Sequence, residues 1–260
     1  MLKLNIPSPI TKLHSDFLSQ KSIEVYVKRD DLIHDVISGN KWRKLKYHFM
    51  EAQKKNIKTI LSFGGQYSNH LHALSYLSNI SGFNSIGIVR GNKNMKLNST
   101  LSFCKSNNML FHYINRHQYR FQKYSSDYLQ QFKDLFGDYF LIPEGGNNIL
   151  GVKGCLEILQ EVDVDFDYVC CSVGTGCTAS GIIQSLNKKQ FLIGFCPFQK
   201  VFEQKKNIER LCKNNYVNWE LVPDLSFKGF GKIDTNLTAF VQKFYINYNN
   251  IICIIGSYTN

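Results

Sequence analysis

The residue of this sequence best suited to covalent chemistry is Lys41, in the segment Ser38-Gly39-Asn40-Lys41. An alternating run at 24–31, typical of a strand, precedes it, and apolar residues recur at helical spacing after it. A lysine at a helix start lies beside the positive end of the helix, which disfavours the ammonium form and favours a reactive free amine. A basic cluster of this kind is also typical of a solvated helix start, so both interpretations are open.

A second segment predicts an anion site. Residues 59–63 are β-branched or apolar and predict a buried strand, which Gly64-Gly65 ends. Ser68 or Asn69 can then cap the helix that follows. The first-turn N–H groups of such a helix are unpaired and attract negative charge. An ordinary strand-to-helix turn would explain the same residues.

A third segment has the composition of a phosphate loop. The predicted buried strand 168–173 leads into Gly174-Thr175-Gly176-Cys177-Thr178, and a second helix is predicted after it. Small residues allow successive backbone N–H groups to face one phosphate, and threonine hydroxyls add donors. The chain has neither GxxxxGK[ST] nor GxGxxG with a downstream acid, so a small phosphorylated cofactor is favoured over a nucleotide.

In their order and spacing, these segments resemble the 1-aminocyclopropane-1-carboxylate deaminase / D-cysteine desulfhydrase family. That family lies within the tryptophan-synthase-β-like, fold type II, pyridoxal 5'-phosphate enzymes. The resemblance covers nearly the whole chain except about the last ten residues. The segments that carry it are Pro7-Ser8-Pro9, Val27-Lys28-Arg29-Asp30-Asp31, Ser38-Gly39-Asn40-Lys41, Gly64-Gly65-Gln66-Tyr67-Ser68-Asn69-His70, Gly87-Ile88-Val89-Arg90-Gly91, Pro143-Glu144-Gly145-Gly146 and Gly174-Thr175-Gly176.

The resemblance implies a role for each matching residue. Lys41 corresponds to the lysine that attaches the cofactor covalently, and Ser68 to a serine that assists proton transfer. Asn69 corresponds to an asparagine that binds the ring oxygen of the cofactor. The turn of Ser68, Asn69 and His70 would receive the substrate carboxylate. The phosphate would lie in the loop of Gly174, Thr175, Gly176, Cys177 and Thr178. Lys44, one helical turn from Lys41, either repels positive charge on Lys41 or is an exposed surface lysine.

The resemblance also implies an α/β fold of type II, with two open parallel-sheet domains and the cofactor between them. We expect residues 1–51 and 146–260 to form the large domain and residues 52–145 the small one. Gly145-Gly146 would be a hinge where the chain returns, or an ordinary tight turn. Expected strands are 23–27, 59–63, 85–89, 110–114, 139–142, 168–173 and 191–195, and expected helices include 42–55 and 152–162.

Composition limits the class of partner. The chain of 260 residues is 43% hydrophobic and has a formal net charge of +11. Its basic residues are spread through the chain without a nucleic-acid-binding motif. The eight cysteines form no CxxC pair, which favours a reducing, cytoplasmic location without zinc. No apolar run reaches membrane-spanning length. We expect a small amino-acid substrate, no metal and no nucleic-acid or membrane partner, and we allow for a homodimer.

The C-terminal segment departs from the family pattern. Family members continue through a Tyr-Thr/Glu-Gly-Lys type of segment to a closing helix and strand, whereas this chain ends at Asn260. We therefore expect a truncated end, and a frameshift just before the motif would explain it. Thr259 would favour the desulfhydrase over the cyclopropane-opening reaction if it takes the position after the motif tyrosine. Phe230 stands where a tyrosine is usual, and Cys177, where glycine is common, would be strained if its φ were positive.

Two functions follow from these residues. The first is a pyridoxal-phosphate-dependent lyase or deaminase that acts on D-cysteine or on 1-aminocyclopropane-1-carboxylate. The alternative is an inactive, truncated remnant that still binds the cofactor.

Overall fold

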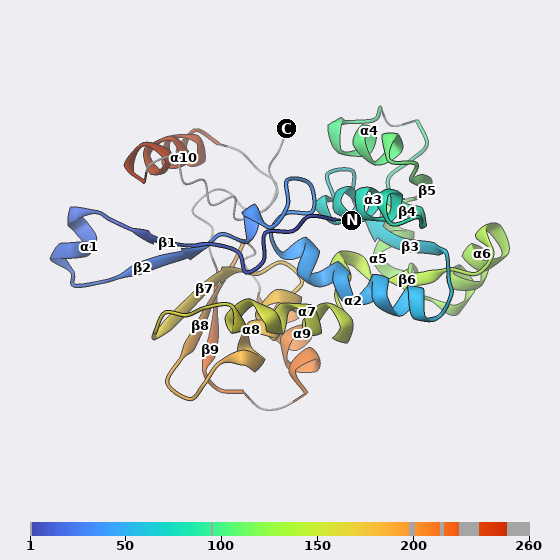
Figure 1. Ribbon diagram of the computed structural model, residues 1–260. Helices are drawn as coiled ribbons and strands as arrows, with labels where there is room; N and C mark the ends of the chain where they lie inside the picture. Colours follow the sequence, from blue (N-terminus) through green and yellow to red (C-terminus); the bar gives the residue numbers. More distant parts are fainter. Residues whose placement is uncertain (1, 95, 198–200, 214–215, 224–233, 249–260) are drawn as a thin grey trace. The chain divides into compact units, whose positions relative to one another are not determined.

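The computed structural model describes residues 2–94, 96–197, 201–213, 216–223 and 234–248 (Figure 1). Contacts between Cα atoms divide the chain into two compact units. Unit 1 consists mainly of Val36–Gly154, and unit 2 consists of Lys3–Asp35 with the described residues from Cys155 onward. A parallel sheet lies at the centre of each unit, which confirms the predicted α/β class.

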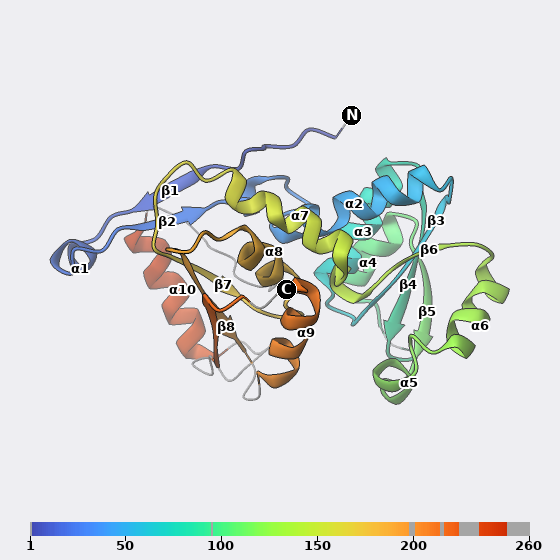
Figure 2. The same ribbon diagram turned by 90° about the horizontal axis from the view of Figure 1, so that it is seen from below.

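Unit 1 contains a four-stranded parallel sheet with strand order β5-β4-β3-β6. Its strands alternate with helices along the chain (Figures 1 and 2). The elements are α2 (Asn40–Lys54), β3 (Thr59–Gly64), α3 (Asn69–Ile80), β4 (Asn84–Arg90), α4 (Ser99–Ser106), β5 (Leu110–Ile114), α5 (Arg116–Phe121), α6 (Ser126–Phe136), β6 (Phe140–Ile142), the 3-10 turn η2 (Glu144–Gly146) and the first half of α7 (Ile149–Gln160).

Helices cover both faces of this sheet, because successive side chains of a strand point to opposite faces. In β3, Ile60 packs into one core with residues of α2, α3 and α4. Its neighbours Leu61 and Phe63 pack into a second core with Tyr119 and Phe132, from α5 and α6. The central strand is therefore buried along nearly its whole length, as the apolar run predicted.

Unit 2 contains a three-stranded parallel sheet with strand order β7-β8-β9 and a separate antiparallel pair, β1-β2. Residues of α8, α9 and the second half of α7 pack with Val173, Leu192 and Cys196 in its core. The elements of this unit are β1 (Ile10–Leu13), α1 (Asp16–Gln20), β2 (Val25–Lys28), the 3-10 turn η1 (Asp30–Leu32), β7 (Tyr168–Ser172), α8 (Cys177–Ser185), β8 (Phe191–Cys196), α9 (Phe202–Cys212), β9 (Trp219–Pro223) and α10 (Thr235–Asn247).

Three expectations about the strands need correction. The strand expected at 23–27 is not part of a parallel sheet, because β2 pairs antiparallel with β1, which was not predicted. Strand β9 was also missed. The strand expected to be buried at 168–173 is buried only in part, since Cys170 is exposed and Tyr168 keeps 65% of its surface accessible. The other predicted strands are confirmed to within one or two residues.

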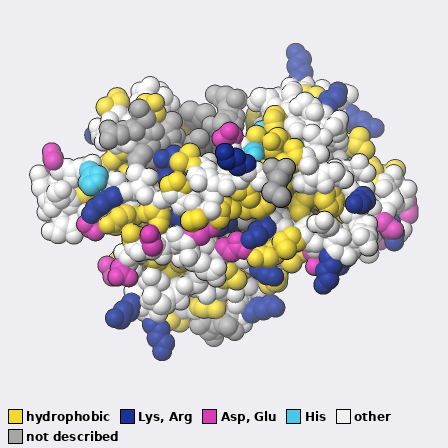
Figure 3. All heavy atoms as spheres, in the orientation of Figure 1, with side chains coloured by type: hydrophobic (Ala, Val, Ile, Leu, Met, Phe, Trp, Pro, Cys, Tyr) yellow, Lys and Arg dark blue, Asp and Glu magenta, His cyan; other side chains and the backbone are white. Residues whose placement is uncertain are grey.

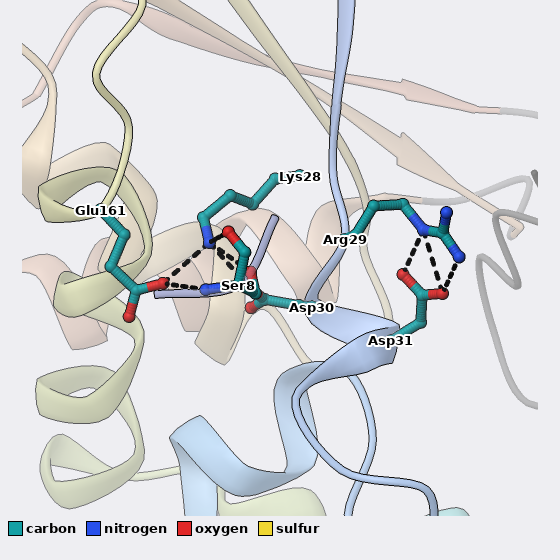
Figure 4. Close-up of polar contacts among 6 residues, drawn as sticks. All are labelled: Ser8, Lys28, Arg29, Asp30, Asp31 and Glu161. Carbon is teal, nitrogen blue, oxygen red and sulfur yellow. Dashed lines mark hydrogen bonds and ion pairs between the residues drawn. The ribbon is translucent and has the colours of Figure 1, made fainter. Parts of the chain in front are cut away.

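Two of the motif segments, Pro7-Ser8-Pro9 and Val27–Asp31, are joined in unit 2 (Figure 4). The Lys28 ammonium lies 2.8 Å from Glu161 Oε2 and also contacts Asp30 and the Ser8 hydroxyl. Ser8 donates from its backbone N–H to Glu161 Oε2 and from Oγ to Asp30 Oδ1. Arg29 pairs with Asp31 at 2.7 Å. These motif residues hold the N-terminal segment against the region just after α7.

The division by contacts differs from the expected domain borders. The sequence predicted that the chain leaves the large domain after residue 51, near the end of α2, and returns at residue 146. In the structure α2 groups with the four-stranded sheet, because Leu45 and Phe49 share a core with Leu71 and Leu74. The second border falls within α7, where Gly154 lies against the Arg43 carbonyl of α2.

The C-terminal predictions concern residues outside the described part of the chain: Phe230, the end at Asn260 and the position of Thr259. None of the described helices is long and apolar enough to cross a bilayer. On the face drawn in Figure 3, Lys and Arg side chains lie apart from one another among uncharged and acidic groups.

Candidate active site

Lys41 lies in the first turn of α2, which begins at Asn40, two residues earlier than predicted. Its side chain is half-buried, and its Nζ donates to Asn40 Oδ1 at 2.6 Å. The amine therefore lies at the positive end of α2, as the sequence predicted.

Lys44 is not an exposed surface lysine, because only 6% of it is accessible. Within the described residues its ammonium has neither a carboxylate partner nor a hydrogen-bond acceptor. An ammonium without an anionic partner is available to pair with a bound anion. This position therefore fits a site that receives an anionic ligand.

The turn between β3 and α3 has the geometry of an anion site. Ser68 caps α3, and its Oγ accepts from the Leu71 N–H at 3.2 Å. In the described part of the chain, the N–H groups of Asn69 and His70 donate to no acceptor. Tyr67 beside them is 64% exposed, so the turn is open to solvent. Two free N–H groups and a hydroxyl can bind a carboxylate here.

Only glycine fits at the end of β3. A Cβ at Gly64 would lie 2.6 Å from Ser68 Oγ and 2.7 Å from two atoms of Leu71. The strand can therefore come this close to α3 only without a side chain at position 64. At Gly65 the nearest group to a Cβ would be the flexible Arg90 guanidinium, at 3.4 Å.

His70 points into unit 1. Its side chain is 4% exposed, and its Nε2 lies 2.8 Å from Ser62 Oγ. Burial lowers the pKa of His70 well below its ordinary value, and the charges of Lys44 and Lys41 lower it further. Helices α2 and α3 are also in contact. Direct contact between His70 and a substrate stays a prediction.

In unit 2, the loop after β7 forms a cradle of unpaired donors. The N–H groups of Gly174, Thr175 and Gly176 donate to no described acceptor. Thr175 Oγ1 is buried and also has no partner among the described residues. A buried hydroxyl is normally hydrogen-bonded, so a Thr175 hydroxyl without a described partner is consistent with a ligand that binds here. Three N–H groups and one hydroxyl match the acceptor oxygens of a phosphate.

The strain that a positive φ would cause at Cys177 is absent. Cys177 is the first residue of α8 and is fully buried, and its φ is not positive. Gly176 has the positive φ instead, at 88°. A Cβ there would also lie 2.8 Å from Ile208 Cγ1, so glycine is required on both counts. Thr178 follows Cys177 in the first turn of α8.

Gly145 and Gly146 form a tight turn, and a hinge at this turn stays a prediction. Both have positive φ, and the Gly146 N–H donates to the Pro143 carbonyl at 2.8 Å.

Sequence reasoning missed the side chains that support these turns. Asn98 donates to the Gln66 carbonyl at 2.8 Å while it caps α4. Asn207 of α9 donates to the Thr175 carbonyl. Both lie about thirty residues from the turn they hold. Asn98 at least carries a signal, since an asparagine before a predicted helix is a typical cap.

The predicted site residues therefore occur as two groups. Lys41, Ser68, Asn69 and His70 belong to unit 1, whereas residues 174–178 belong to unit 2. A comparison with known protein families matches residues 2–202 to the family described as pyridoxal-phosphate dependent enzyme. The chain belongs to this family. The family depends on pyridoxal phosphate, which confirms the predicted cofactor class.

Individual relatives agree with the resemblance found in the sequence. A Thermotoga maritima protein provisionally named 1-aminocyclopropane-1-carboxylate deaminase is 34% identical over 68% of this chain and 58% of its own length. An Arabidopsis thaliana protein, named bifunctional D-cysteine desulfhydrase/1-aminocyclopropane-1-carboxylate deaminase, is 29% identical over 68% of this chain and 48% of its own length. These two alignments span about half the length of each relative.

A solved structure shows the fold. The crystal structure of an ACC deaminase homologue matches with a TM-score of 0.79 at 24% identity, and the match covers 96% of this chain and 81% of that chain.

The residues present fit the cofactor. Lys41 offers an amine for covalent attachment, and the cradle of Gly174, Thr175 and Gly176 offers unpaired donors for the phosphate. Lys44 adds a positive charge one helical turn after Lys41. When bound, the cofactor supplies an electron sink for carbanion chemistry.

The two glycines of the β3–α3 turn should respond differently to one added methyl group. Gly64→Ala should lower the free energy of unfolding by about 1–3 kcal/mol, because the new Cβ displaces Ser68 and Leu71. Gly65→Ala is the matched control and should change it by less than about 1 kcal/mol. Urea denaturation monitored by circular dichroism measures both. Equal losses would show that the close approach at Gly64 does not limit the fold.

Acid should destabilise the protein through His48 and His70. Burial lowers the pKa of His48 to about 4 and lowers the pKa of His70 as well. The unfolded chain protonates both near pH 6.5, so below that pH the unfolded state binds more protons and stability is lost as the pH falls toward 4. Between these pH values, each histidine lowers the free energy of unfolding by about 1.4 kcal/mol per pH unit.

His48→Gln removes one of these two groups. Its free energy of unfolding, measured at several pH values between 7 and 4, should therefore fall less steeply with falling pH than that of the wild type. The exposed His117→Gln is the control. A slope unchanged in His48→Gln would contradict the burial argument.

Proposed function

We propose that this protein is a pyridoxal-phosphate-dependent lyase or deaminase that acts on a small amino acid. The observation that supports this most strongly is the placement of Lys41 in the first turn of α2, in the same unit as the N–H groups of Asn69 and His70, which donate to no described acceptor. An amine for covalent attachment and a carboxylate site thus lie within one unit.

Each residue would have a distinct task. The α-carboxylate of the substrate binds at the N–H groups of Asn69 and His70, where the helix end favours negative charge. Lys41 Nζ, once released by the substrate amine, takes a proton from the α-carbon. One lone pair of the Ser68 hydroxyl accepts from the Leu71 N–H, and the hydroxyl proton stays available for transfer. Asn69 orients the ring through its side chain, and residues 174–178 hold the phosphate.

The substrate is proposed by chemical class. The names of the relatives point to D-cysteine and to 1-aminocyclopropane-1-carboxylate, and both reactions begin with the same amine exchange and proton removal. The preference for D-cysteine rests on Thr259, which lies outside the described residues.

Lys41→Ala tests covalent attachment. The wild-type protein with pyridoxal phosphate should absorb at about 410–430 nm, a property of the attached cofactor. The variant should lose this band and all turnover, because the amine that forms the bond is gone. Lys54→Ala, an exposed lysine near the other end of the same helix, should keep both. If borohydride reduction and peptide mapping place the cofactor on another lysine, the assignment of Lys41 is wrong.

Substrate assays test the reaction. We expect release of sulfide and pyruvate from D-cysteine to be faster than release of a 2-oxo acid from 1-aminocyclopropane-1-carboxylate. Equal or faster turnover of the cyclopropane would reverse the substrate preference. A protein that keeps the visible band but converts neither compound would instead match the cofactor-binding remnant.

A further inference from the structure

Asn98 lies directly before α4 and joins that helix to the turn between β3 and α3, entirely within unit 1. Its Oδ1 accepts from the Leu101 N–H at 2.9 Å and so caps α4. Its Nδ2 donates to the Gln66 carbonyl at 2.8 Å. The two contacts assign the amide, since the oxygen must face the N–H donor and the nitrogen must face the carbonyl. Both ends of this side chain are therefore used.

A helix cap alone does not require asparagine at position 98. Asp and Ser cap helices about as well as Asn does. An ionised Asp can only accept hydrogen bonds, however, and the hydroxyl of Ser has one oxygen for both tasks. Asparagine offers an acceptor and an N–H donor on separate atoms of one planar group. The contact with the Gln66 carbonyl is therefore the one for which the amide nitrogen is needed.

The turn that Asn98 holds has few other restraints. It is open to solvent, since Tyr67 is 64% exposed, and the Gly64-Gly65 pair before it has no side chain that could anchor it. The Ser68 N–H donates to the Gly65 carbonyl at 3.1 Å and closes the turn. Among the described residues, Asn98 alone uses its side chain to hydrogen-bond the backbone of residues 65–68.

Helix α4 gives Asn98 a firm support, and Figures 1 and 2 show this helix beside α3. Leu101 of α4 is fully buried in one core with Leu71 of α3. The Phe103 ring stacks on the His72 ring of α3, with centroids 3.9 Å apart and 17° between the planes. These contacts fix α4 against α3, so the Asn98 amide acts on the turn from a packed element. Packed helices hold site residues more precisely than loops do.

We propose that Asn98 is a positioning residue for the carboxylate site of the β3–α3 turn. By holding the Gln66 carbonyl, it fixes the turn that leads to Asn69 and His70, whose N–H groups donate to no described acceptor. These donors are then arranged before a carboxylate binds, so binding costs less ordering of the backbone. The inference deepens the proposed function and rests on it for the carboxylate.

Two variants of Asn98 separate positioning from capping. Asn98→Ser keeps an oxygen for the cap but removes the N–H donor to Gln66, whereas Asn98→Ala removes both. Asn98→Ala should therefore be the less stable variant. Both variants should weaken the binding of a carboxylate equally, by about threefold to tenfold, which is the value of one hydrogen bond. Asn115→Ser is the matched control, because Asn115 is the exposed asparagine cap of α5.

Acetate, titrated into the full-length protein at constant ionic strength, probes the carboxylate site without cofactor or turnover. In nitrogen-15 amide NMR, the Asn69 and His70 signals of the wild type should shift with acetate. The dissociation constant should rise in both Asn98 variants and stay unchanged in Asn115→Ser. Unchanged affinity in Asn98→Ser overturns the proposal, because the donor would then have no effect on the site. A loss of affinity in Asn98→Ala alone also overturns it, since that loss would come from the cap.

Amino-acid binding gives a readout that a purely structural role would not move. D-Alanine and ethylamine both bind through their amines, but only D-alanine has a carboxylate. In protein loaded with pyridoxal 5'-phosphate, absorbance titration should show weaker binding of D-alanine to Asn98→Ser and unchanged binding of ethylamine. Equal losses for the two ligands overturn the proposal. A protein that shows the expected binding but converts neither candidate substrate would refute the proposed reaction and leave the role of Asn98 standing.

Discussion

The close approach of β3 to the helix that follows it is the constraint on which the site in unit 1 depends. Gly64 lies so near Ser68 Oγ and Leu71 that no Cβ fits between them. Because the strand can come this close, Ser68 caps α3, and the N–H groups of Asn69 and His70 have no acceptor in the described part of the chain. The same approach carries the His70 side chain inward to Ser62. The absence of a side chain at Gly64 therefore determines the position of both the anion site and the buried His70.

A glycine also positions the candidate phosphate loop of unit 2. There the positive φ of Gly176 turns the chain into α8, and packing against Ile208 holds the turn in place. Asn207, from the same helix as Ile208, donates to the Thr175 carbonyl. This hydrogen bond fixes the orientation of the peptide that follows Thr175. Both candidate sites lie at the carboxyl ends of parallel strands, where open α/β sheets bind their ligands.

Two buried lysines show how the surroundings decide the role of one side-chain type. Lys28 has a 15% exposed side chain and contacts the carboxylates of Asp30 and Glu161, so its charge is balanced within unit 2. Lys44 is 6% exposed and its side chain has no carboxylate partner in the described part of the chain. A balanced pair favours one arrangement of the chain, whereas an unbalanced cation favours the binding of an anion.

The sequence by itself determined the alternation of strands and helices, the candidate lysine and both glycine turns. These features depend on local periodicity, on capping residues and on glycine, whose effects act over a few neighbouring residues. Lys41, Ser68 and residues 174–178 could be named for this reason, and β3 could be predicted as buried.

Only the tertiary structure decided which of these residues are buried and what they contact. Lys44 looked as much like a surface lysine as a functional one, and Cys170 looked buried, because burial depends on elements that pack from elsewhere in the chain. The antiparallel pairing of β2 with β1, the support of Thr175 by Asn207 and the contact of His70 with Ser62 all depend on residues that are distant in the sequence or on elements that pack together. Such contacts leave no periodic signal in a single sequence, since any of many polar residues could make them once the fold brings it near.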